Sequence, residues 1–240
     1  TLNSGIAIID SEKKSVIDYL SIDGSWISDI FLSKNGDVLA GHSANGRNYI
    51  WDLKNNYTTI TLPEDLLNYK ITSLTELGNV IVKGNGKYIF WNPLKSVIEK
   101  EIVISGKLAD IDSSGNMLLY YDTDFQYYNA SIDSISFRKH HENWPYYLKE
   151  QDTIVRIPIQ LSLTVGQLTD QYIFTAGVDR SIRKWSKIDG QHIEDIIEHK
   201  ATISAIDLST DQSQLVSVDL KGGILFYEIN KKQLTRNKRH

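Results

Sequence analysis

The sequence predicts an all-β fold assembled from repeated four-stranded units. Two patterns support this prediction. A strand ending in an aromatic residue recurs along the chain after a tight polar turn, and a hairpin signal precedes most of these recurrences. The composition agrees, because 15 Gly against only 4 Pro, with Ile, Val, Thr and Tyr spread throughout, favours strands and turns.

The recurring aromatic layout is clearest in SANGRNYIWD and KGNGKYIFWN. In each, an Asn-Gly turn is followed by a short strand-like run that ends in Trp and a polar residue. Read with a period of two, the charged stretch VDRSIRKWSKIDGQHI fits the same layout as a strand, not a helix. The layout recurs at Asn45-Gly46 with Trp51-Asp52, Asn85-Gly86 with Trp91-Asn92, Asp122 with Tyr128-Asn129, Asp179 with Trp185-Ser186, and Gly222-Gly223 with Tyr227-Glu228.

The spacing of this layout is nearly constant. Trp91 follows Trp51 by 40 residues, Tyr128 follows Trp91 by 37, and Tyr227 follows Trp185 by 42. The exception is the interval of 57 residues between Tyr128 and Trp185, which indicates one unit carrying an insertion. Such a period with several short strands per unit is that of a β-propeller of four-stranded antiparallel blades. An all-β sandwich is the competing fold.

Each unit also has a consistent first half, in which a strand, a turn and a second strand follow one another. Gly, Asn and Asp accept positive φ at low cost, so these residues between apolar runs predict hairpins. The same chemistry at Asp189-Gly190 leads into an outer fourth strand. The first-half turns are Lys34-Asn35-Gly36, Leu77-Gly78, Ser114-Gly115 and Thr210-Asp211.

These motifs resemble the WD-repeat family of β-propellers. Only Trp51-Asp52 reproduces the eponymous dipeptide, while His199 fits the family's first-strand His and Asp179 its turn Asp. The resemblance implies that such side chains form buried hydrogen bonds tying strands together. Most units depart from the motif, so we expect stability to rest mainly on apolar packing between blades. The expected structural blade residues are Trp51, Asp52, Trp91, Tyr128, Asp179, Trp185, His199 and Tyr227.

We expect about five full blades plus a partial amino-terminal one, within residues 1–230. The chain opens with Thr1, not Met, so we expect it to be a piece of a longer protein. The partial blade is expected to be completed by a missing upstream segment, by residues skipped in this sequence, or by strands donated in trans. The predicted boundaries are 1–22 for the partial blade, 23–62, 63–105, 106–130, 154–198 and 199–232 for the blades, 131–153 for an inserted loop and 233–240 for a basic tail.

Composition excludes several classes of function. A net charge of −4 provides no overall basic field for nucleic acid, although a local basic patch remains compatible with it. Zero Cys excludes disulfides, thiolate catalysis and Cys-type zinc sites. No apolar run approaches the ~20 residues of a membrane-spanning helix. We expect an intracellular protein, nuclear or cytoplasmic, partly from this cysteine usage and partly from the family resemblance.

Catalytic motifs are weak throughout. The run KGNGKYIF leads into a strand, which predicts a hairpin turn and not a phosphate loop, and no G-x-S-x-G pattern is present. Adjacent His140 and His141 in KHHE point to opposite faces of an extended chain, so a solvated loop is favoured over a metal site. We therefore expect no enzyme activity, no cofactor and no metal. A propeller enzyme with carboxylates gathered in a central channel stays open as an alternative.

Two groups of residues are candidates for binding. The predicted insertion concentrates cationic and aromatic side chains of the types that dominate protein-binding hot spots, and the competing interpretation is that it only covers a blade edge. The turns NGR, NGK, DRS and LKGG carry cations that a propeller would gather on one face, unless they are merely solvated. The protein-binding candidates are Arg138, Lys139, His140, His141, Trp144, Tyr146 and Tyr147; the basic turn face comprises Arg47, Lys87, Arg180 and Lys221.

The function that the resemblance implies is a non-catalytic scaffold, a subunit or domain of a larger multi-protein complex with other protein subunits as partners. The alternative from the residues is a nucleic-acid-associated scaffold that uses the basic turns.

Overall fold

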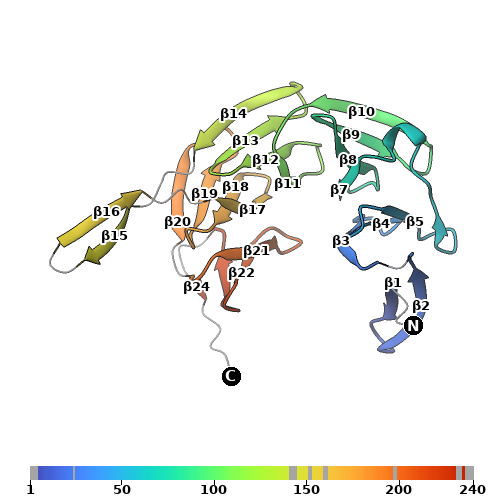
Figure 1. Cartoon of the computed structure of the whole chain (residues 1–240), viewed down its shortest axis with the longest axis horizontal. Helices are drawn as coiled ribbons and strands as arrows, with labels where there is room; N and C mark the ends of the chain where they lie inside the picture. Colours follow the sequence, from blue (N-terminus) through green and yellow to red (C-terminus); the bar gives the residue numbers. More distant parts are fainter. Residues whose placement is uncertain are drawn as a thin grey trace. The chain divides into compact units, whose positions relative to one another are not determined.

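The computed structural model describes residues 5–23, 25–140, 145–150, 153–158, 162–196, 199–230 and 234–235, with the backbone alone at 145–150, 153–158 and 234–235. These residues form an all-β structure whose one helix is a single 3-10 turn, η1 (Glu64–Leu66). They contain five four-stranded antiparallel sheets and two two-stranded hairpins, so the predicted propeller-type fold class is confirmed (Figure 1). The chain divides into two compact units, Thr1–Ser105 and Gly106–His240.

The first unit begins with a hairpin and continues with two blades. In each blade the strands are paired in chain order, as expected for successive hairpins. The hairpin consists of β1 (Gly5–Asp10) and β2 (Ser15–Ser21). Blade 1 consists of β3 (Ile27–Leu32), β4 (Val38–Ser43), β5 (Asn48–Asp52) and β6 (Thr58–Thr59), and blade 2 of β7 (Lys70–Leu74), β8 (Val80–Gly84), β9 (Lys87–Asn92) and β10 (Val97–Val103).

The core of the first unit lies between its two blades. Three consecutive residues of β8, Val80, Ile81 and Val82, are fully buried, so both faces of this inner strand are covered. Trp91 on β9 packs in the same cluster as Ile50 of blade 1. Continuous apolar runs in the middle strands, with polar residues at the outer ones, are what stacking of blades requires.

The second unit holds three blades and an inserted hairpin. Blade 3 consists of β11 (Lys107–Ile111), β12 (Met117–Tyr121), β13 (Asp124–Asn129) and β14 (Ser134–His140). The hairpin consists of β15 (Pro145–Glu150) and β16 (Thr153–Pro158). Blade 4 consists of β17 (Leu163–Leu168), β18 (Tyr172–Gly177), β19 (Ile182–Ser186) and β20 (His192–Ile196), and blade 5 of β21 (Ile203–Leu208), β22 (Gln214–Asp219), β23 (Ile224–Glu228) and β24 (Leu234–Thr235).

The structure corrects the predicted boundaries around residues 106–130 and 131–153. The segment expected to be an inserted loop begins with β14, which pairs with β13 and completes blade 3. Asp133 at φ +50° makes the turn, and Phe137 stacks on Tyr127 with ring centroids 5.3 Å apart. Alternation of exposed and half-buried residues along β14 is the mark of a strand with one face packed. Of the described residues that follow, Pro145–Glu150 form β15, which pairs with β16 (Thr153–Pro158) in a separate hairpin.

The other boundaries shift less. Blade 4 begins at Leu163 rather than at residue 154, because β16 occupies residues 153–158. Blade 5 extends into the predicted tail, since Leu234 and Thr235 pair with Tyr227 and Phe226. Residues 236–240 of that tail lie outside the described part of the chain.

Trp185 joins blades 3 and 4. Its ring lies edge-on to Phe125 of β13 with centroids 5.0 Å apart, and its Nε1 donates to Thr175 Oγ1 at 2.8 Å. The following Asp-Gly turn serves the same joint. Gly190 has φ +67°, and a Cβ there would lie 2.7 Å from the Phe137 ring, so only glycine fits both the turn and the close approach to β14.

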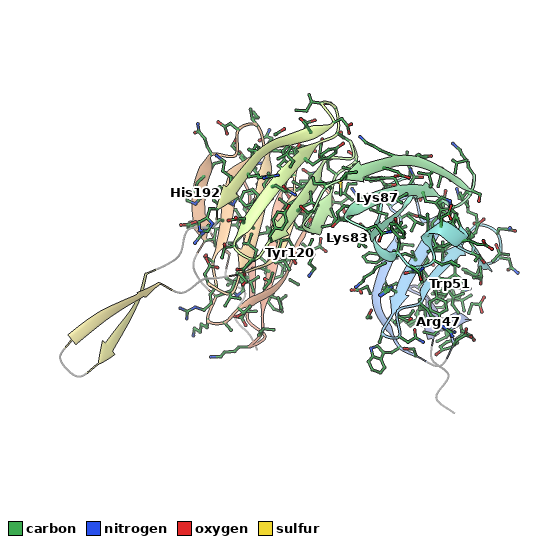
Figure 2. The ribbon with its side chains drawn as sticks, turned by 45° about the horizontal axis from the view of Figure 1, so that its top comes forward. Arg47, Trp51, Lys83, Lys87, Tyr120 and His192 are labelled. Carbon is green, nitrogen blue, oxygen red and sulfur yellow. The ribbon has the colours of Figure 1, made fainter. Side chains whose placement is uncertain are left out.

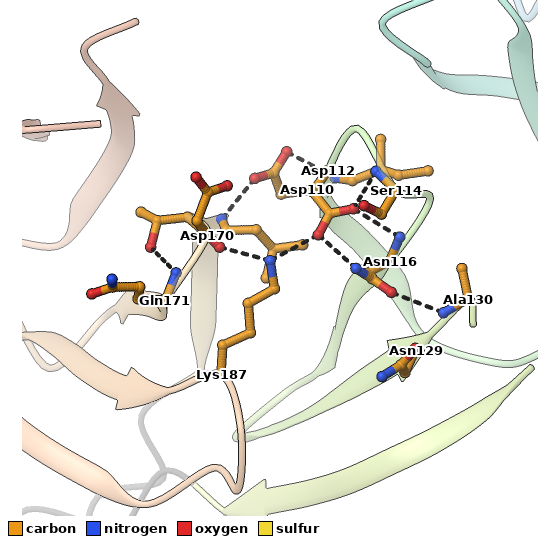
Figure 3. Close-up of polar contacts among 12 residues, drawn as sticks. Asp110, Asp112, Ser114, Asn116, Asn129, Ala130, Asp170, Gln171 and Lys187 are labelled. Carbon is orange, nitrogen blue, oxygen red and sulfur yellow. Dashed lines mark hydrogen bonds and ion pairs between the residues drawn. The ribbon is translucent and has the colours of Figure 1, made fainter. Parts of the chain in front are cut away.

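A polar cluster strengthens the same joint (Figure 3). Lys187 Nζ donates to Asp112 Oδ2 at 2.8 Å and to the Thr169 carbonyl oxygen at 2.7 Å, and Asn116 donates to Asp112 at 2.8 Å. Burial by itself would raise the pKa of Asp112, but the bonds from Lys187 and Asn116 outweigh it and the pKa lies below its ordinary value. The ionised carboxylate of Asp112 thus links blade 3 to blade 4 through Lys187.

Candidate functional site

A buried Ser-His-Asp arrangement in blade 5 has the connectivity of a hydrolase triad. His199 Nε2 lies 2.7 Å from Ser217 Oγ, and His199 Nδ1 lies 3.1 Å from Asp219 Oδ2. All three residues are buried, with His199 7% exposed and Ser217 1% exposed, so a substrate has no access to the hydroxyl. Asp219 also accepts the backbone N–H of Gly223 at 2.8 Å. The arrangement closes the β22–β23 turn and has a structural role.

Blade 4 holds a different buried network. Asp179 accepts from Ser181 Oγ at 2.5 Å and from Arg183 Nη2 at 3.0 Å. Burial is the largest influence and raises the pKa of Asp179, with the two donors opposing it. A charged pair this deeply buried must be hydrogen-bonded to be tolerated, and here it fixes the β18–β19 turn.

The other predicted structural residues also lie inside the blades. Trp51, Trp91, Tyr128 and Tyr227 are all buried near the ends of their third strands. Asp52 is half-buried, and its Oδ1 accepts the backbone N–H groups of the two residues at the following turn, Lys54 and Asn55.

The four residues of the basic turn face divide between the two units. Arg47 and Lys87 belong to the first (Figure 2). Arg47 is ion-paired with Asp23 and Lys87 with Glu101, each at 2.7 Å. The bond to Glu101 raises the pKa of Lys87. Arg180 and Lys221 belong to the second, at exposed turns of blades 4 and 5. The predicted face is therefore divided evenly between the two units, and its two members in the first unit already have a carboxylate partner.

Three of the seven protein-binding candidates, Arg138, Lys139 and His140, line a surface pocket. It has a volume of about 360 Å³ and lies at the outer end of blade 3; we call it the edge pocket. Three elements form it, since β12 ends, β13 begins and β14 ends at this corner of the sheet. The edge pocket is lined by Tyr121, Asp124, Phe125, Arg138, Lys139 and His140.

The charges of the edge pocket are unequal. Asp124, its one acidic residue, is engaged by the Nδ1 atom of His140. Lys139 lies over the Phe137 ring with its Nζ 5.9 Å from the centroid. Arg138 is exposed, and no ion pair joins it to another residue in the described part of the chain. Arg138 therefore remains as the exposed cation of the pocket after the Asp124–His140 pair is accounted for.

A buried amide supports the wall of the edge pocket. Gln126 is fully buried on β13, opposite Arg138 in the strand register, and its Nε2 donates to the Tyr121 hydroxyl at 2.9 Å. This bond fixes the phenol at the rim. The sequence interpretation found the β14 residues of this pocket but missed Tyr121, Asp124 and Phe125, because only the pairing of β13 with β14 brings them to the same corner.

Two of the remaining candidates lie on the inserted hairpin. Tyr146 and Tyr147 are on β15, opposite Ile157 and Arg156 of β16. His141 and Trp144 lie outside the described residues.

A second, smaller pocket of about 290 Å³ lies on blade 2. Its carboxylate, Glu99, accepts hydrogen bonds from the side-chain amides of Asn79 and Asn92, at 2.5 and 2.9 Å. A carboxylate held by two amides is poorly placed for acid–base work. Among the described residues, no group of three or more His, Asp or Glu side chains is arranged to hold a metal ion. Nor does any helix there have the length and apolarity to cross a membrane.

Comparisons with known proteins identify the fold and nothing narrower. No protein-family model matches the chain, and no curated protein matches it. A chain of the solved structure described as "Crystal Structure of Mitotic Checkpoint Complex" matches with a TM-score of 0.69, covering 95% of this chain and 71% of that chain at 14% sequence identity. In all, 1284 chains of solved structures match, which shows a widely used fold and leaves the function to be argued from the site.

Proposed function

We propose that this protein is a non-catalytic protein-interaction scaffold of the WD-repeat type, working as a subunit or domain of an intracellular multi-protein complex. The observation that carries the proposal is the outer edge of blade 3. There β14, the last strand of its sheet, contributes Arg138, Lys139 and His140 to the edge pocket, and the inserted β15–β16 hairpin follows it in the chain. The structural neighbour comes from a complex of proteins, which agrees with such a role.

The rest of the described polar chemistry supports a scaffold over an enzyme. The Ser217–His199–Asp219 set is buried, Asp112 is bound to Lys187, and Glu99 is bound by two amides. Each of these groups stabilises a turn or a joint between strands. The nucleic-acid alternative gains no comparable support, because two of its four cations are paired with carboxylates.

The hairpin allows a clean test of the proposal. Replacing residues 145–158 with a short Gly-Ser linker leaves β14 and β17 in place, since β15 and β16 pair only with each other among the described strands. The tagged full-length protein and this variant are purified from cells and their co-purifying proteins compared by mass spectrometry. We expect a stable set of partners, part of which is lost with the hairpin. If neither protein retains stoichiometric partners, the scaffold proposal fails.

A further inference from the structure

We propose that the edge of blade 3 binds an extended acidic peptide, which adds to β14 as a fifth strand and places a carboxylate in the edge pocket against Arg138. This inference rests on the proposed scaffold function and gives the chemistry of one partner.

The backbone of β14 is available for pairing. It has seven residues, stands last in the strand order of its sheet, and pairs with β13 alone among the described strands (Figure 1). In an antiparallel edge strand, every second residue directs its N–H and C=O groups away from its only neighbour. An extended peptide can satisfy these groups, which is how strand addition provides affinity without dependence on sequence.

The two faces of β14 differ. Ile135, Phe137 and Lys139 are half-buried, and a Cβ added at Gly190 of blade 4 would lie 2.7 Å from the Phe137 ring, so the β19–β20 turn lies close to this face. Ser136, Arg138 and His140 alternate with them and are exposed. A peptide beside β14 therefore meets hydroxyl, guanidinium and imidazole groups. These groups form a polar surface that suits polar side chains better than apolar ones.

The positive charge of the edge pocket favours an acidic peptide. The pocket offers Arg138 as its exposed cation, because Lys139 is half-buried and lies over the Phe137 ring while Asp124 is already engaged by His140. A guanidinium binds a carboxylate in a bidentate geometry, so a Glu or Asp of the peptide fits this corner. The outer strand of blade 2 makes an internal contrast: β10 also has seven residues but carries Glu99 and Glu101 on either side of Lys100, so it offers no exposed cationic corner for the same peptide.

The test is a selection of random nine-residue display peptides against the whole protein, followed by affinity measurements on the peptides obtained. We expect the selected peptides to carry Asp or Glu at alternate positions. Their affinity should fall roughly tenfold for Arg138→Glu and should weaken as salt is raised, as for partly exposed charge pairs. The Arg180→Glu variant reverses an exposed Arg on a turn of blade 4 and is the matched control.

The outcomes separate the two proposals. Selected peptides that lack acidic residues, or that bind Arg138→Glu as tightly as wild type, overturn the acidic-strand inference, and so does a selection that yields no binders. If Arg180→Glu abolishes binding instead, the basic turns and not β14 hold the peptide. Partners that depend on the hairpin while Arg138→Glu retains them would leave the scaffold function standing without this peptide site. Circular dichroism and thermal midpoints show whether each variant is folded.

Discussion

Single buried polar residues close two turns of this protein through side-chain hydrogen bonds. His199 bridges Ser217 and Asp219, and Asp179 gathers Ser181 and Arg183, so a side chain closes the turn between the second and third strands of blades 5 and 4. Buried groups of this kind contribute mainly through the cost of leaving their partners unpaired.

The substitution His199→Ala should destabilise the protein markedly. It leaves Ser217 and Asp219 buried with one partner fewer, which costs about 2 kcal/mol of unfolding free energy. Urea denaturation measures the change. His140→Ala, which removes an exposed imidazole whose partner among the described residues is Asp124, is the control and should change stability by less than ~0.5 kcal/mol. Equal effects of the two substitutions would contradict the structural role of His199.

Asp219 should make stability fall in acid. The N–H of Gly223 is the main influence that lowers its pKa to about 2, with His199 and other donors adding to it. Because the folded pKa lies below the unfolded value of about 3.9, the stabilisation is complete above that value and is lost as the pH falls towards 2.

This dependence can be isolated by comparing the wild type with Asp219→Asn. The difference in unfolding free energy between them should be largest near pH 6 and shrink between about pH 4 and pH 2. A difference that stays constant over this range would show that the ionised form of Asp219 provides no stabilisation.

At the scale of elements, the outer strand β14 lies against the next blade. The turn between β19 and β20 packs on β14 through Gly190, so a residue chosen for its turn geometry also sets how closely blades 3 and 4 approach. Polar joints such as Lys187 with Asp112 then fix the register between the same two blades.

Gly190→Ala should reveal this double role. A Cβ at φ +67° is strained, and it would also lie 2.7 Å from the Phe137 ring, so we expect a loss of about 2–3 kcal/mol. Gly86→Ala is the matched control, since Gly86 has φ +74° with no atom within 4 Å and should lose only the backbone cost of about 1 kcal/mol. Thermal or urea unfolding measures the stability of both variants. Equal losses of unfolding free energy would mean that β14 shifts to accommodate the new methyl group without further cost.

At the scale of the whole molecule, stability and binding should be separable. Apolar clusters between neighbouring blades supply the core, whereas the inserted hairpin forms a two-stranded sheet of its own. Two-stranded hairpins contribute little stability by themselves.

Replacing residues 145–158 with a linker should therefore leave the thermal midpoint nearly unchanged while removing partners. Differential scanning calorimetry on the variant and the wild type measures the midpoint. A large fall would show that the hairpin is part of the folded core and that lost binding reflects lost structure.

Much of the fold was determined by the sequence alone. Asn, Asp and Gly turns at a constant spacing from Trp or Tyr predicted strands, hairpins and repeated blades, because turn residues and strand periodicity act locally. The same reasoning placed Arg138, Lys139 and His140 among the candidates for binding, from their density in one segment.

Only the tertiary structure decided that Ser134–His140 is the fourth strand of blade 3 and not part of a loop. The sequence SISFRKH has only two apolar residues, so its alternation is a weak strand signal. The alternating burial of the strand arises from pairing with β13 and from the turn at Gly190, which lies close to one face. Likewise, Tyr121, Asp124 and Phe125 join the edge pocket because three strands end or begin at one corner of the sheet. Such contacts depend on pairing between distant strands, which local sequence patterns do not encode.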